Sequence, residues 1–270
     1  MNDIKLAGRT VLITGASSGI GAAFADVFAI HGFDLVITAR RRERLNAEAA
    51  RLERTYRRRV DVLAYDLSRR EAPAHLCYEL ASRGLTIDAL VNSAGYGVPG
   101  TYDASPWTRQ EGMLNVMVMA MAELTHRLLP AMIERRYGRI VNVASLAGLV
   151  PAPAGHTLYA ATKAFAIKFS EALAHEGRPH GVHVTAVCPG FTLSEFHDVT
   201  GTRGQVSKLP SWLWMDAPTV AREGFDAVMQ GTPIHINGRA NRAIAAFARY
   251  LPQPVVTWAG RQLGKTYRKT

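Results

Sequence analysis

A run of glycines near the start of the chain limits the possible folds more than any other feature. The apolar segment Thr10–Thr14 predicts a buried strand, and Gly15, Gly19 and Gly21 follow it before a helical stretch begins. Glycines let the backbone turn tightly and approach a pyrophosphate closely, while the helix amino terminus offers free N–H groups and positive potential. A glycine cluster can also be a simple tight turn, but its place between a strand and a helix favours dinucleotide binding.

The rest of the chain alternates short apolar segments with longer amphipathic ones, which is typical of a parallel sheet wound by helices. Right-handed crossovers place alternate helices on opposite faces of such a sheet. We therefore expect an α/β fold, a Rossmann-type doubly wound parallel sheet of about seven strands with helices on both faces. The expected strands are Thr10–Thr14, Asp34–Thr38, Val60–Ala64, Ala89–Asn92, Arg139–Val143, His183–Val187 and Ile234–Ile236. The expected helices are Gly19–Ile30, Arg42–Tyr56, Arg70–Ser82, Trp107–Glu134, Tyr159–Glu176 and Thr219–Met229.

We expect residues 1–270 to form one domain, because no internal repeat or low-complexity linker divides the sequence. Residues 190–218 are rich in Gly, Pro, Ser and Trp and are expected to be an irregular substrate loop, since long loops in compact domains are often lids or binding loops. Residues 238–270 are expected to form a helical extension. Helical spacing in this extension predicts one apolar side made of Ile244, Phe247, Ala248 and Leu251.

The net charge of +10 is concentrated in two segments. Arg40–Arg59 holds nine arginines and three glutamates, and Arg239–Thr270 holds seven basic residues and no acidic one. Neither segment has an aromatic RNA-binding motif or a helix-turn-helix pattern, so we expect no nucleic-acid partner. A solvated helix face and a basic tail account for the charge. Contact of the tail with an anionic membrane remains an alternative to packing on the protein itself.

The two cysteines, Cys77 and Cys188, lie far apart and show neither CxxC nor Cys/His spacing. This argues against a disulfide framework and a metal site, and it fits a reducing compartment. The first residues lack the charged and apolar parts of a signal peptide, and no run of about 18 apolar residues predicts a membrane-spanning helix. We therefore expect a cytoplasmic protein.

Two arginines, Arg40 and Arg41, follow the second expected strand. An acidic residue at that point would bind the adenosine ribose hydroxyls and select NAD. A guanidinium instead forms forked hydrogen bonds to phosphate, which favours the 2′-phosphate of NADP. NADP(H) is the expected cofactor and NAD(H) remains possible. The alternative is that both arginines simply begin a solvated basic helix.

Tyr159 and Lys163 are four residues apart and therefore share one helical face. A free tyrosine, with a pKa near 10, is a poor proton donor or acceptor at neutral pH, but a nearby ammonium group lowers that pKa. A tyrosine tuned in this way can exchange a proton with a carbonyl oxygen as hydride arrives. Ser145, after the Arg139–Val143 strand, can hydrogen-bond the same oxygen. Alternatively, Ser145 only caps a turn.

Together these motifs resemble the short-chain dehydrogenase/reductase family, strongly from about Gly8 to Pro189 and more weakly beyond. Thr14–Gly21 is similar to the TGxxxGxG motif of the family, and Asn92–Gly95 is similar to its NNAG motif, with Ser93 in place of the second Asn. The catalytic tetrad of the family is matched by Asn115, Ser145, Tyr159 and Lys163.

The resemblance implies a role for each matched position. Lys163 would also bind the nicotinamide ribose, Asn115 would support a water chain, and Thr192 would contact the nicotinamide amide. Ser18 stands where many NADP-using relatives carry a basic residue, so the 2′-phosphate contact would depend on the two arginines and Ser17. The expected cofactor contacts are Gly15, Ser17, Ser18, Gly19, Ile20, Gly21, Arg40, Arg41, Asp66, Leu67, Asn92, Ala94, Gly95, Tyr159, Lys163, Pro189, Gly190 and Thr192.

Residues near the expected site favour a hydrophobic carbonyl or secondary alcohol substrate, although the aromatic ones could instead seal the core. They are Leu146, His156, Leu158, Tyr96 to Val98, Phe191, Phe196, Trp212, Trp214 and Met215. A homodimer or homotetramer is expected, because the helices Trp107–Glu134 and Tyr159–Glu176 carry more apolar residues than the side that faces the sheet requires. The extra residues are Met117, Met119, Met121, Ala166 and Phe169. The alternative function is a catalytically idle cofactor-binding regulator or scaffold.

Overall fold

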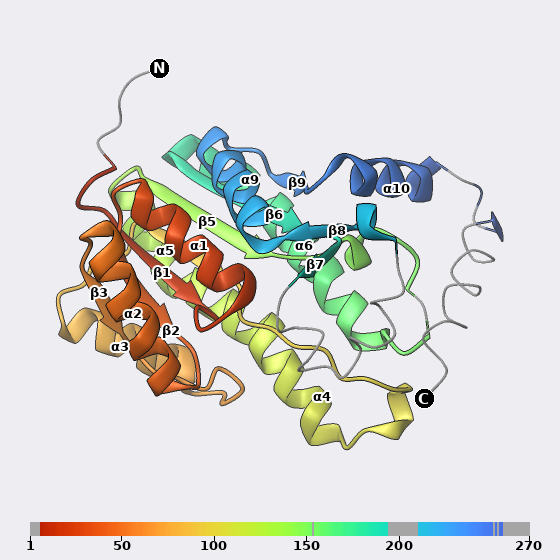
Figure 1. Ribbon diagram of the computed structural model, residues 1–270, viewed down its shortest axis with the longest axis horizontal. Coiled ribbons are helices and arrows are strands. Elements are labelled where there is room, and N and C mark those ends of the chain that lie inside the picture. Colours follow the sequence, from red (N-terminus) through yellow and green to blue (C-terminus); the bar gives the residue numbers. More distant parts are fainter. Residues whose placement is uncertain (1–5, 153, 194–209, 251, 253, 256–270) are drawn as a thin grey trace.

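The computed structural model describes residues 6–152, 154–193, 210–250, 252 and 254–255. Over these residues a seven-stranded, fully parallel sheet has the order β3-β2-β1-β4-β5-β6-β9 (Figure 1). This order confirms the doubly wound α/β prediction, because the chain moves outward from β1 in both directions. The strands are β1 (Thr10–Thr14), β2 (Asp34–Thr38), β3 (Val60–Val62), β4 (Ala89–Asn92), β5 (Gly138–Val143), β6 (Val182–Cys188) and β9 (Ile234–Ile236).

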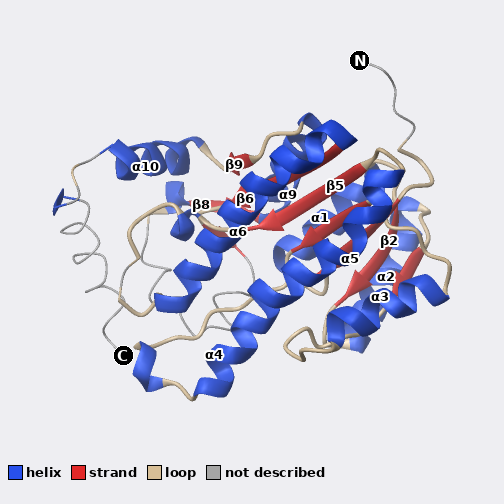
Figure 2. Cartoon of the chain, turned by 180° about the vertical axis from the view of Figure 1, so that it is seen from behind, coloured by secondary structure: helices blue, strands red, loops and turns tan. Residues whose placement is uncertain are grey.

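Helices cover both faces of the sheet (Figures 1 and 2). One face packs against α1 (Gly19–Ile30), α2 (Arg42–Tyr56) and α9 (Ala217–Gln230). The other face packs against α3 (Ala72–Ser82), α5 (Met121–Glu134) and α6 (Thr157–Gly177), and α4 (Trp107–Leu114) continues into α5. The remaining helix, α10 (Arg239–Tyr250), lies beyond β9. The 3-10 turns are η1 (Tyr102–Ala104), η3 (Leu146–Gly148), η4 (Arg178–His180) and η5 (Ser211–Leu213).

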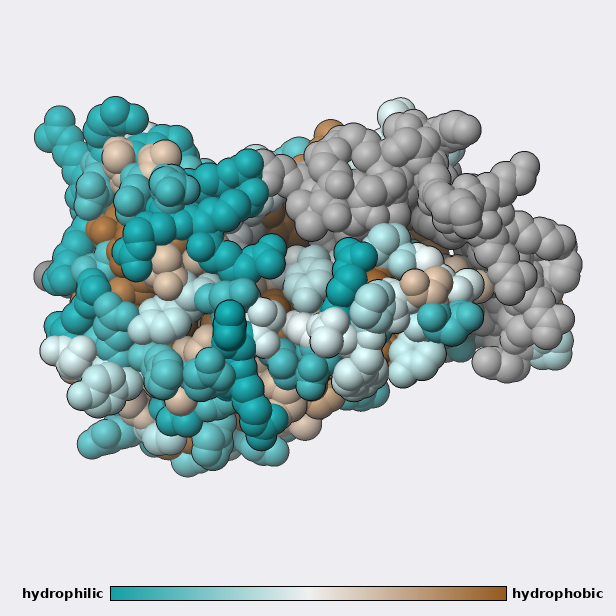
Figure 3. Space-filling model, turned by 90° about the horizontal axis from the view of Figure 1, so that it is seen from below, coloured by the Kyte–Doolittle hydropathy of each residue, from teal (hydrophilic) through white to brown (hydrophobic). Residues whose placement is uncertain are grey.

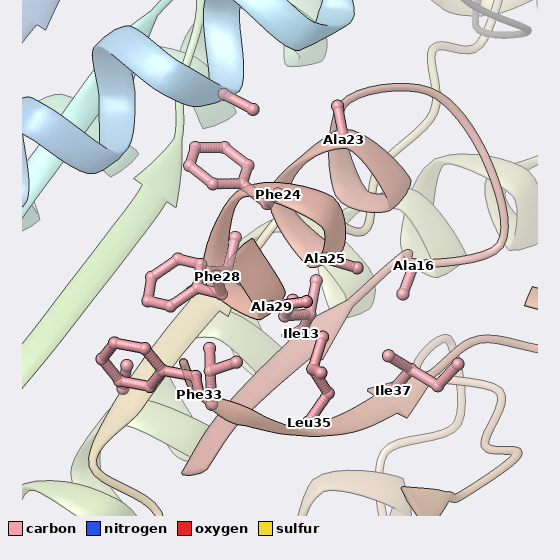
Figure 4. Close-up of a cluster of buried hydrophobic side chains, with 14 of the residues drawn as sticks. Ile13, Ala16, Ala23, Phe24, Ala25, Phe28, Ala29, Phe33, Leu35 and Ile37 are labelled. Carbon is pink, nitrogen blue, oxygen red and sulfur yellow. The ribbon is translucent and has the colours of Figure 1, made fainter. Parts of the chain in front are cut away.

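The sheet is apolar on both faces because successive residues of a strand point in opposite directions. In β1, Val11 and Ile13 enter the core under α1, whereas Leu12 enters the core on the opposite face. Phe24 and Phe28 of α1 lie in the core under α1. The rings of Phe28 and Phe33 pack edge to face, with 5.0 Å between their centroids (Figure 4). The face shown in Figure 3 is mostly hydrophilic over the described residues. The packing of α1 on the apolar strands therefore fixes the position of the glycine turn, which joins β1 to α1.

The helix expected from Trp107 to Glu134 is interrupted by a six-residue π-helix, Asn115–Ala120, between α4 and α5. By length and composition this helical run is apolar enough to cross a membrane, contrary to the expectation that no segment would be. It packs along the sheet, and buried Met113, Met117 and Leu124 belong to the second core. The run therefore behaves as a core helix in this fold.

The expected irregular stretch between Phe191 and Pro218 contains regular structure. A short parallel pair, β7 (Phe191–Leu193) and β8 (Trp214–Asp216), joins its two ends, and α9 already begins at Ala217. The sequence lacks alternation here because strands of three residues are too short to show a period. Residues 194–209, which include Phe196, lie outside the described residues.

Candidate functional site

The glycine turn between β1 and α1 has no room for a side chain at two positions. A Cβ added at Gly15, whose φ is +70°, would lie 2.8 Å from the Cα and 2.9 Å from the N of Ala94. A Cβ at Gly21 would collide with the carbonyl oxygen of Gly15. No acidic residue occupies the first turn of α1, so its positive end is not neutralised there. These features fit the cradle that a pyrophosphate requires.

Thr14, which the sequence analysis did not select as a site residue, fastens this turn to the loop after β4. Its hydroxyl accepts hydrogen bonds from the N of Ser93 at 3.0 Å and the N of Ala94 at 3.1 Å, and it donates to the carbonyl oxygen of Val91 at 3.3 Å. The hydroxyl therefore fixes the two loops that the motif comparison assigned to the cofactor. A threonine at the end of β1, directly before the first glycine, was the available signal.

Asn92 uses its side chain inside the protein. Its Nδ2 donates to Oδ1 of Asn142 at 2.8 Å and to Oγ1 of Thr125 at 3.3 Å, and Asn142 donates in turn to Oγ of Ser170 at 2.9 Å. All four side chains are buried. This network ties β4 and β5 to α5 and α6, so the Asn92 side chain, an expected cofactor contact, holds these two strands to the helices that cover them.

At the expected adenosine end, Nη2 of Arg41 donates to Oγ of Ser17 over 3.4 Å, and Arg40 is exposed next to Arg41 in the chain. The structure thus brings together the β2 end and the glycine turn, as an adenosine phosphate site requires. The carboxylate of Asp66 accepts from the N of Ser68 at 3.0 Å and from its Oγ at 2.8 Å, which fixes the loop after β3. Two further expected contacts, Ile20 and Leu67, pack their side chains on the two hydrophobic cores.

The catalytic candidates converge at the carboxyl ends of β5 and β6. Tyr159 forms a side-chain hydrogen bond with Ser145. The Nζ of Lys163 donates to the carbonyl oxygen of Val143 at 2.7 Å and lies 5.7 Å from the centre of the Tyr159 ring. The Oγ of Ser145 also accepts from the N of Ala147 at 3.1 Å. Ser145 therefore caps η3 and contacts Tyr159 at the same time, so its two interpretations are compatible.

Burial sets the protonation of this cluster. Desolvation raises the pKa of Tyr159 to about 12, and the hydrogen bond from Ser145 only partly offsets that rise. Desolvation also lowers the pKa of Lys163 to about 8. The sequence analysis expected Lys163 to lower the tyrosine pKa, whereas here desolvation raises it and the hydrogen bond with Ser145 is the opposing effect. At neutral pH Tyr159 is a neutral phenol, the form that donates a proton.

Asn115 is the first residue of the π-helix, and its Nδ2 donates to the carbonyl oxygen of Ser68 at 3.0 Å. The side chain therefore anchors the loop after β3 to the helix that faces Lys163. A π-helix changes the pairing of backbone carbonyls from i+4 to i+5, and such segments occur often at functional sites. Near it, Met117, Ala120, Asn92 and Lys163 are among the residues that line a small pocket.

The expected nicotinamide end is held by backbone hydrogen bonds. The N of Leu146 donates to the carbonyl oxygen of Pro189 at 2.9 Å, which links the Ser145 loop to the turn after β6. Buried Thr192 donates from Oγ1 to the carbonyl oxygen of Gly190 at 3.2 Å. The structure therefore places the serine loop and the Pro189–Gly190 turn side by side, as the motif comparison implied.

Asn241 of α10 is a residue that the sequence analysis missed. Its amide occupies the space beside Gly190, where an added Cβ would lie 2.5 Å from Oδ1 of Asn241 and 2.7 Å from its Nδ2. Asn241 is 4% exposed, and its Nδ2 donates to the carbonyl oxygen of Asn237 at 2.8 Å. The only sequence signal was a polar residue within an amphipathic helix, which apolar spacing does not detect.

The predicted apolar side of α10 is partly wrong. Asn241 and Ala245 are buried and Ile244 and Ala248 are half-buried, whereas Phe247 is 69% exposed. A helix places residues 241, 244, 245 and 248 on one side, and this side packs on the protein. Leu251 lies outside the described residues.

The expected substrate lining is only partly assembled. The ring of His156 packs edge-on against Tyr159 at a centroid distance of 5.8 Å, and burial lowers the pKa of His156, so the imidazole is neutral at pH 7. Phe191 packs on Trp214 at 5.7 Å. Trp212 is 65% exposed and Val98 is buried in the core. The expected lining residues therefore divide between the site, the core and the surface.

Comparison with known proteins gives consistent matches. A family model described as short chain dehydrogenase matches residues 9–203, a range that holds the glycine turn and all four tetrad positions. The "Inactive hydroxysteroid dehydrogenase-like protein 1" of Rattus norvegicus is 32% identical over 270 residues, which cover 98% of this chain and 79% of the rat protein.

Solved structures agree in fold over most of the chain. A short-chain dehydrogenase from Sphingobium yanoikuyae in complex with NADPH has a TM-score of 0.79 and 31% identity, and the match covers 91% of this chain and 96% of that one. A 7beta-hydroxysteroid dehydrogenase structure has a TM-score of 0.84 and 25% identity over 98% of this chain and all of the other, 100%. These likenesses confirm the doubly wound fold.

Proposed function

This chain belongs to the short-chain dehydrogenase family, and we propose that it is an NADP(H)-preferring oxidoreductase that interconverts a hydrophobic carbonyl compound and its secondary alcohol. The observation that carries the proposal is the convergence of Ser145, Tyr159 and Lys163 beside the Pro189–Gly190 turn. A neutral phenol, a hydroxyl that bonds to it and a nearby amine form the set of groups that proton transfer to a carbonyl oxygen requires.

The nicotinamide ring, when bound, supplies or accepts the hydride. Tyr159 holds the proton that passes to the substrate oxygen, because its high pKa keeps the phenol neutral. Ser145 shares a hydrogen bond with Tyr159 and can orient the same oxygen. Lys163, held on Val143, places an ammonium group near the phenol below pH 8 and would bind the nicotinamide ribose hydroxyls. These roles favour carbonyl reduction at neutral pH.

The preference for NADP(H) is supported by the arginines after β2 and by the NADPH-bound relative. Arg41 already reaches Ser17 of the glycine turn, and Arg40 is exposed beside it with no acidic residue at the β2 end. A guanidinium pair at that point offers forked hydrogen bonds to a 2′-phosphate. NAD(H) lacks this group and would bind more weakly.

The direct test is a panel of apolar ketones, aldehydes, hydroxysteroid-type ketones and 3-oxoacyl thioesters, each assayed with NADPH and with NADH. We expect NADPH-dependent consumption of at least one carbonyl compound and a clear preference over NADH. Binding of both nucleotides is measured separately by fluorescence. Tight NADPH binding without turnover of any compound would favour the second candidate function.

That second candidate is a catalytically idle cofactor-binding regulator, and one observation favours it: the rat relative carries the word inactive in its name. Against it, this chain retains all four tetrad residues and brings three of them together. An idle protein has no need of a tyrosine and lysine in this arrangement. The carbonyl panel separates the two candidates.

We also propose a cytoplasmic homodimer or homotetramer. Of the apolar residues that suggested a partner surface, Met117, Met121 and Ala166 are buried within the chain itself, so they cannot form one. Met119 remains 42% exposed, and on α6 the Phe165 ring is exposed and stacks on Phe169. Light scattering of the purified chain tests this, and a monomer at micromolar concentration would contradict it.

A further inference from the structure

The α10 helix has a buried inner side and an exposed outer side. Its inner side, centred on Asn241 and Ala245, packs on Gly190 and Met215 and fixes the helix to the body of the protein. Its outer side, at positions 243, 246, 247 and 250, points away from that contact because a helix turns once every 3.6 residues. The inner side therefore holds α10 on the protein, and the outer side is left exposed.

The outer side carries large exposed aromatic residues. Phe247 is 69% exposed and Tyr250 is 80% exposed. Trp212, on η5 beside α10, is 65% exposed. Figure 1 places α10 at the end of the molecule away from β3. Phe247 and Tyr250 share the outer side of α10, with Trp212 on the neighbouring η5, and exposed aromatic residues on one helix side indicate a binding surface.

Positive charge lies on the same helix as these aromatic residues. Arg239, Arg242 and Arg249 are all exposed, and α10 holds no acidic residue. Glu171 of α6 is near enough to Arg249 to sense its charge, but its carboxylate is paired with Lys168 at 2.6 Å. The sequence from Arg239 to Thr270 as a whole has seven basic residues and no acidic one. No acidic residue within Arg239–Thr270 therefore neutralises the positive charge of these basic residues.

The charge decides between possible occupants. A second copy of the same face would bring six arginines together, and like charges across an interface are unfavourable. An anionic lipid surface instead matches both features, since it attracts arginine and accepts aromatic rings at the level of the headgroups.

We propose that the α10 surface, defined as Trp212, Phe247 and Tyr250 with Arg239, Arg242 and Arg249, docks this protein on the surface of an anionic lipid bilayer. The aromatic rings enter the headgroup region, and the arginines contact lipid phosphates. The protein lies on the membrane and does not span it, because α10 has only 12 residues and one of its sides is buried in the fold. This docking does not depend on the proposed oxidoreductase activity.

Co-sedimentation of the full chain with lipid vesicles tests the proposal. We expect binding to phosphatidylcholine vesicles that contain about one quarter phosphatidylglycerol, weak binding to pure phosphatidylcholine, and release at about 1 M salt, where the Debye length is roughly 3 Å. Substitution of the three arginines by Gln should weaken binding about 100-fold, on the basis of the usual contribution of each basic residue. The combined variant Trp212→Ser, Phe247→Ser and Tyr250→Ser should weaken it at least ~10-fold.

Matched controls come from other parts of the surface. Arg54→Gln, Arg69→Gln and Arg70→Gln remove the same charge from exposed positions elsewhere, and Tyr78→Ser removes an aromatic residue that is 77% exposed on α3. These controls should bind vesicles like the unmodified chain. If the triple serine variant does not fold, as judged by circular dichroism, Phe247→Ser alone serves in its place.

Three results would overturn the proposal. The first is no salt-sensitive binding of the unmodified chain to the anionic vesicles. The second is an equal loss of binding in the α10 variants and in the matched controls. The third is a lower oligomeric mass of the serine variant by light scattering, which would show that the face is covered by a second copy. None of these results bears on the carbonyl panel, so the two proposals fail separately.

Discussion

Gly15 and Gly190 both lie in turns that follow a strand of the sheet, but they require glycine for different reasons. Gly15 has a φ of +70°, and a Cβ there would meet the backbone of Ala94. Gly190 is outside the left-handed region, and a Cβ there would meet the side chain amide of Asn241. The first constraint is built from backbone and cannot be relieved, whereas the second is set by one side chain from a distant helix. The two ends of the candidate cofactor site are therefore fixed by a contact with backbone at Gly15 and by a contact with one side chain at Gly190.

The largest effect should come from Gly15→Ala. The added methyl must displace the Ala94 backbone and distort the turn, so we expect NADPH affinity to fall at least ~100-fold, because the N–H groups of a distorted turn no longer face the pyrophosphate. Gly84→Ala is the matched control: Gly84 has a φ of +65° but nothing within 4 Å of its Cβ position. Isothermal titration of both variants measures the difference. Equal affinities would show that steric contact at Gly15 is irrelevant.

Arg40→Asp tests the adenosine end alone. One charge-assisted phosphate bond contributes about 1.5–3 kcal/mol, so NADPH affinity should fall roughly 10- to 100-fold while NADH affinity changes little. Arg54→Asp makes the same charge change at an exposed position farther along α2 and should leave both affinities unchanged. If the unmodified chain binds NADPH and NADH with the same dissociation constant, the assigned role of Arg40 is wrong.

Gly190→Ala should lower kcat/KM about 10-fold, because the new methyl and the Asn241 amide cannot share one place. The double variant with Asn241→Ala should recover most of that loss, with a coupling energy of about 0.5–3 kcal/mol. No such rescue exists for Gly15→Ala, because its contact is with backbone. Additive losses in the double variant would contradict the difference drawn between the two turns.

The pH profile gives a smaller effect. The pKa of Lys163 is lowered to about 8, so its ammonium form is present below pH 8 and is lost as pH rises through that value. Tyr159, with a pKa of about 12, remains protonated over the same range. We expect kcat/KM for carbonyl reduction to be level from about pH 6 to 7 and halved near pH 8, since this parameter reports the free enzyme. A level profile up to about pH 10 would remove Lys163 from the account.

The sequence was sufficient for the sheet, since continuous apolar strands and amphipathic helices have a period that residues alone reveal. Thr10–Thr14, Gly19–Ile30 and Asp34–Thr38 begin and end where they were expected. The glycine turn could be predicted from its local spacing between a strand and a helix, and the tetrad positions from their resemblance to the family motif. The predicted strands pair with their neighbours in one parallel sheet, as their sequence order suggests.

Tertiary contacts were not predictable in the same way. The contact of Asn241 with Gly190 joins residues far apart in the chain, and apolar spacing placed Phe247 on the wrong side of α10. The raised pKa of Tyr159 follows from burial, which no motif encodes. The π-helix at Asn115 was hidden because its residues continue the same apolar pattern as the α-helices beside it.

The central claim is that Tyr159 donates the proton in a nicotinamide-dependent carbonyl reduction. The most direct measurement compares Tyr159→Phe with the unmodified chain on the best substrate of the panel, with NADPH affinity determined for both. We expect the same NADPH affinity and a fall in kcat of at least ~100-fold, the usual scale for the loss of general acid catalysis. Reduction by Tyr159→Phe at a near-normal rate would contradict the claim.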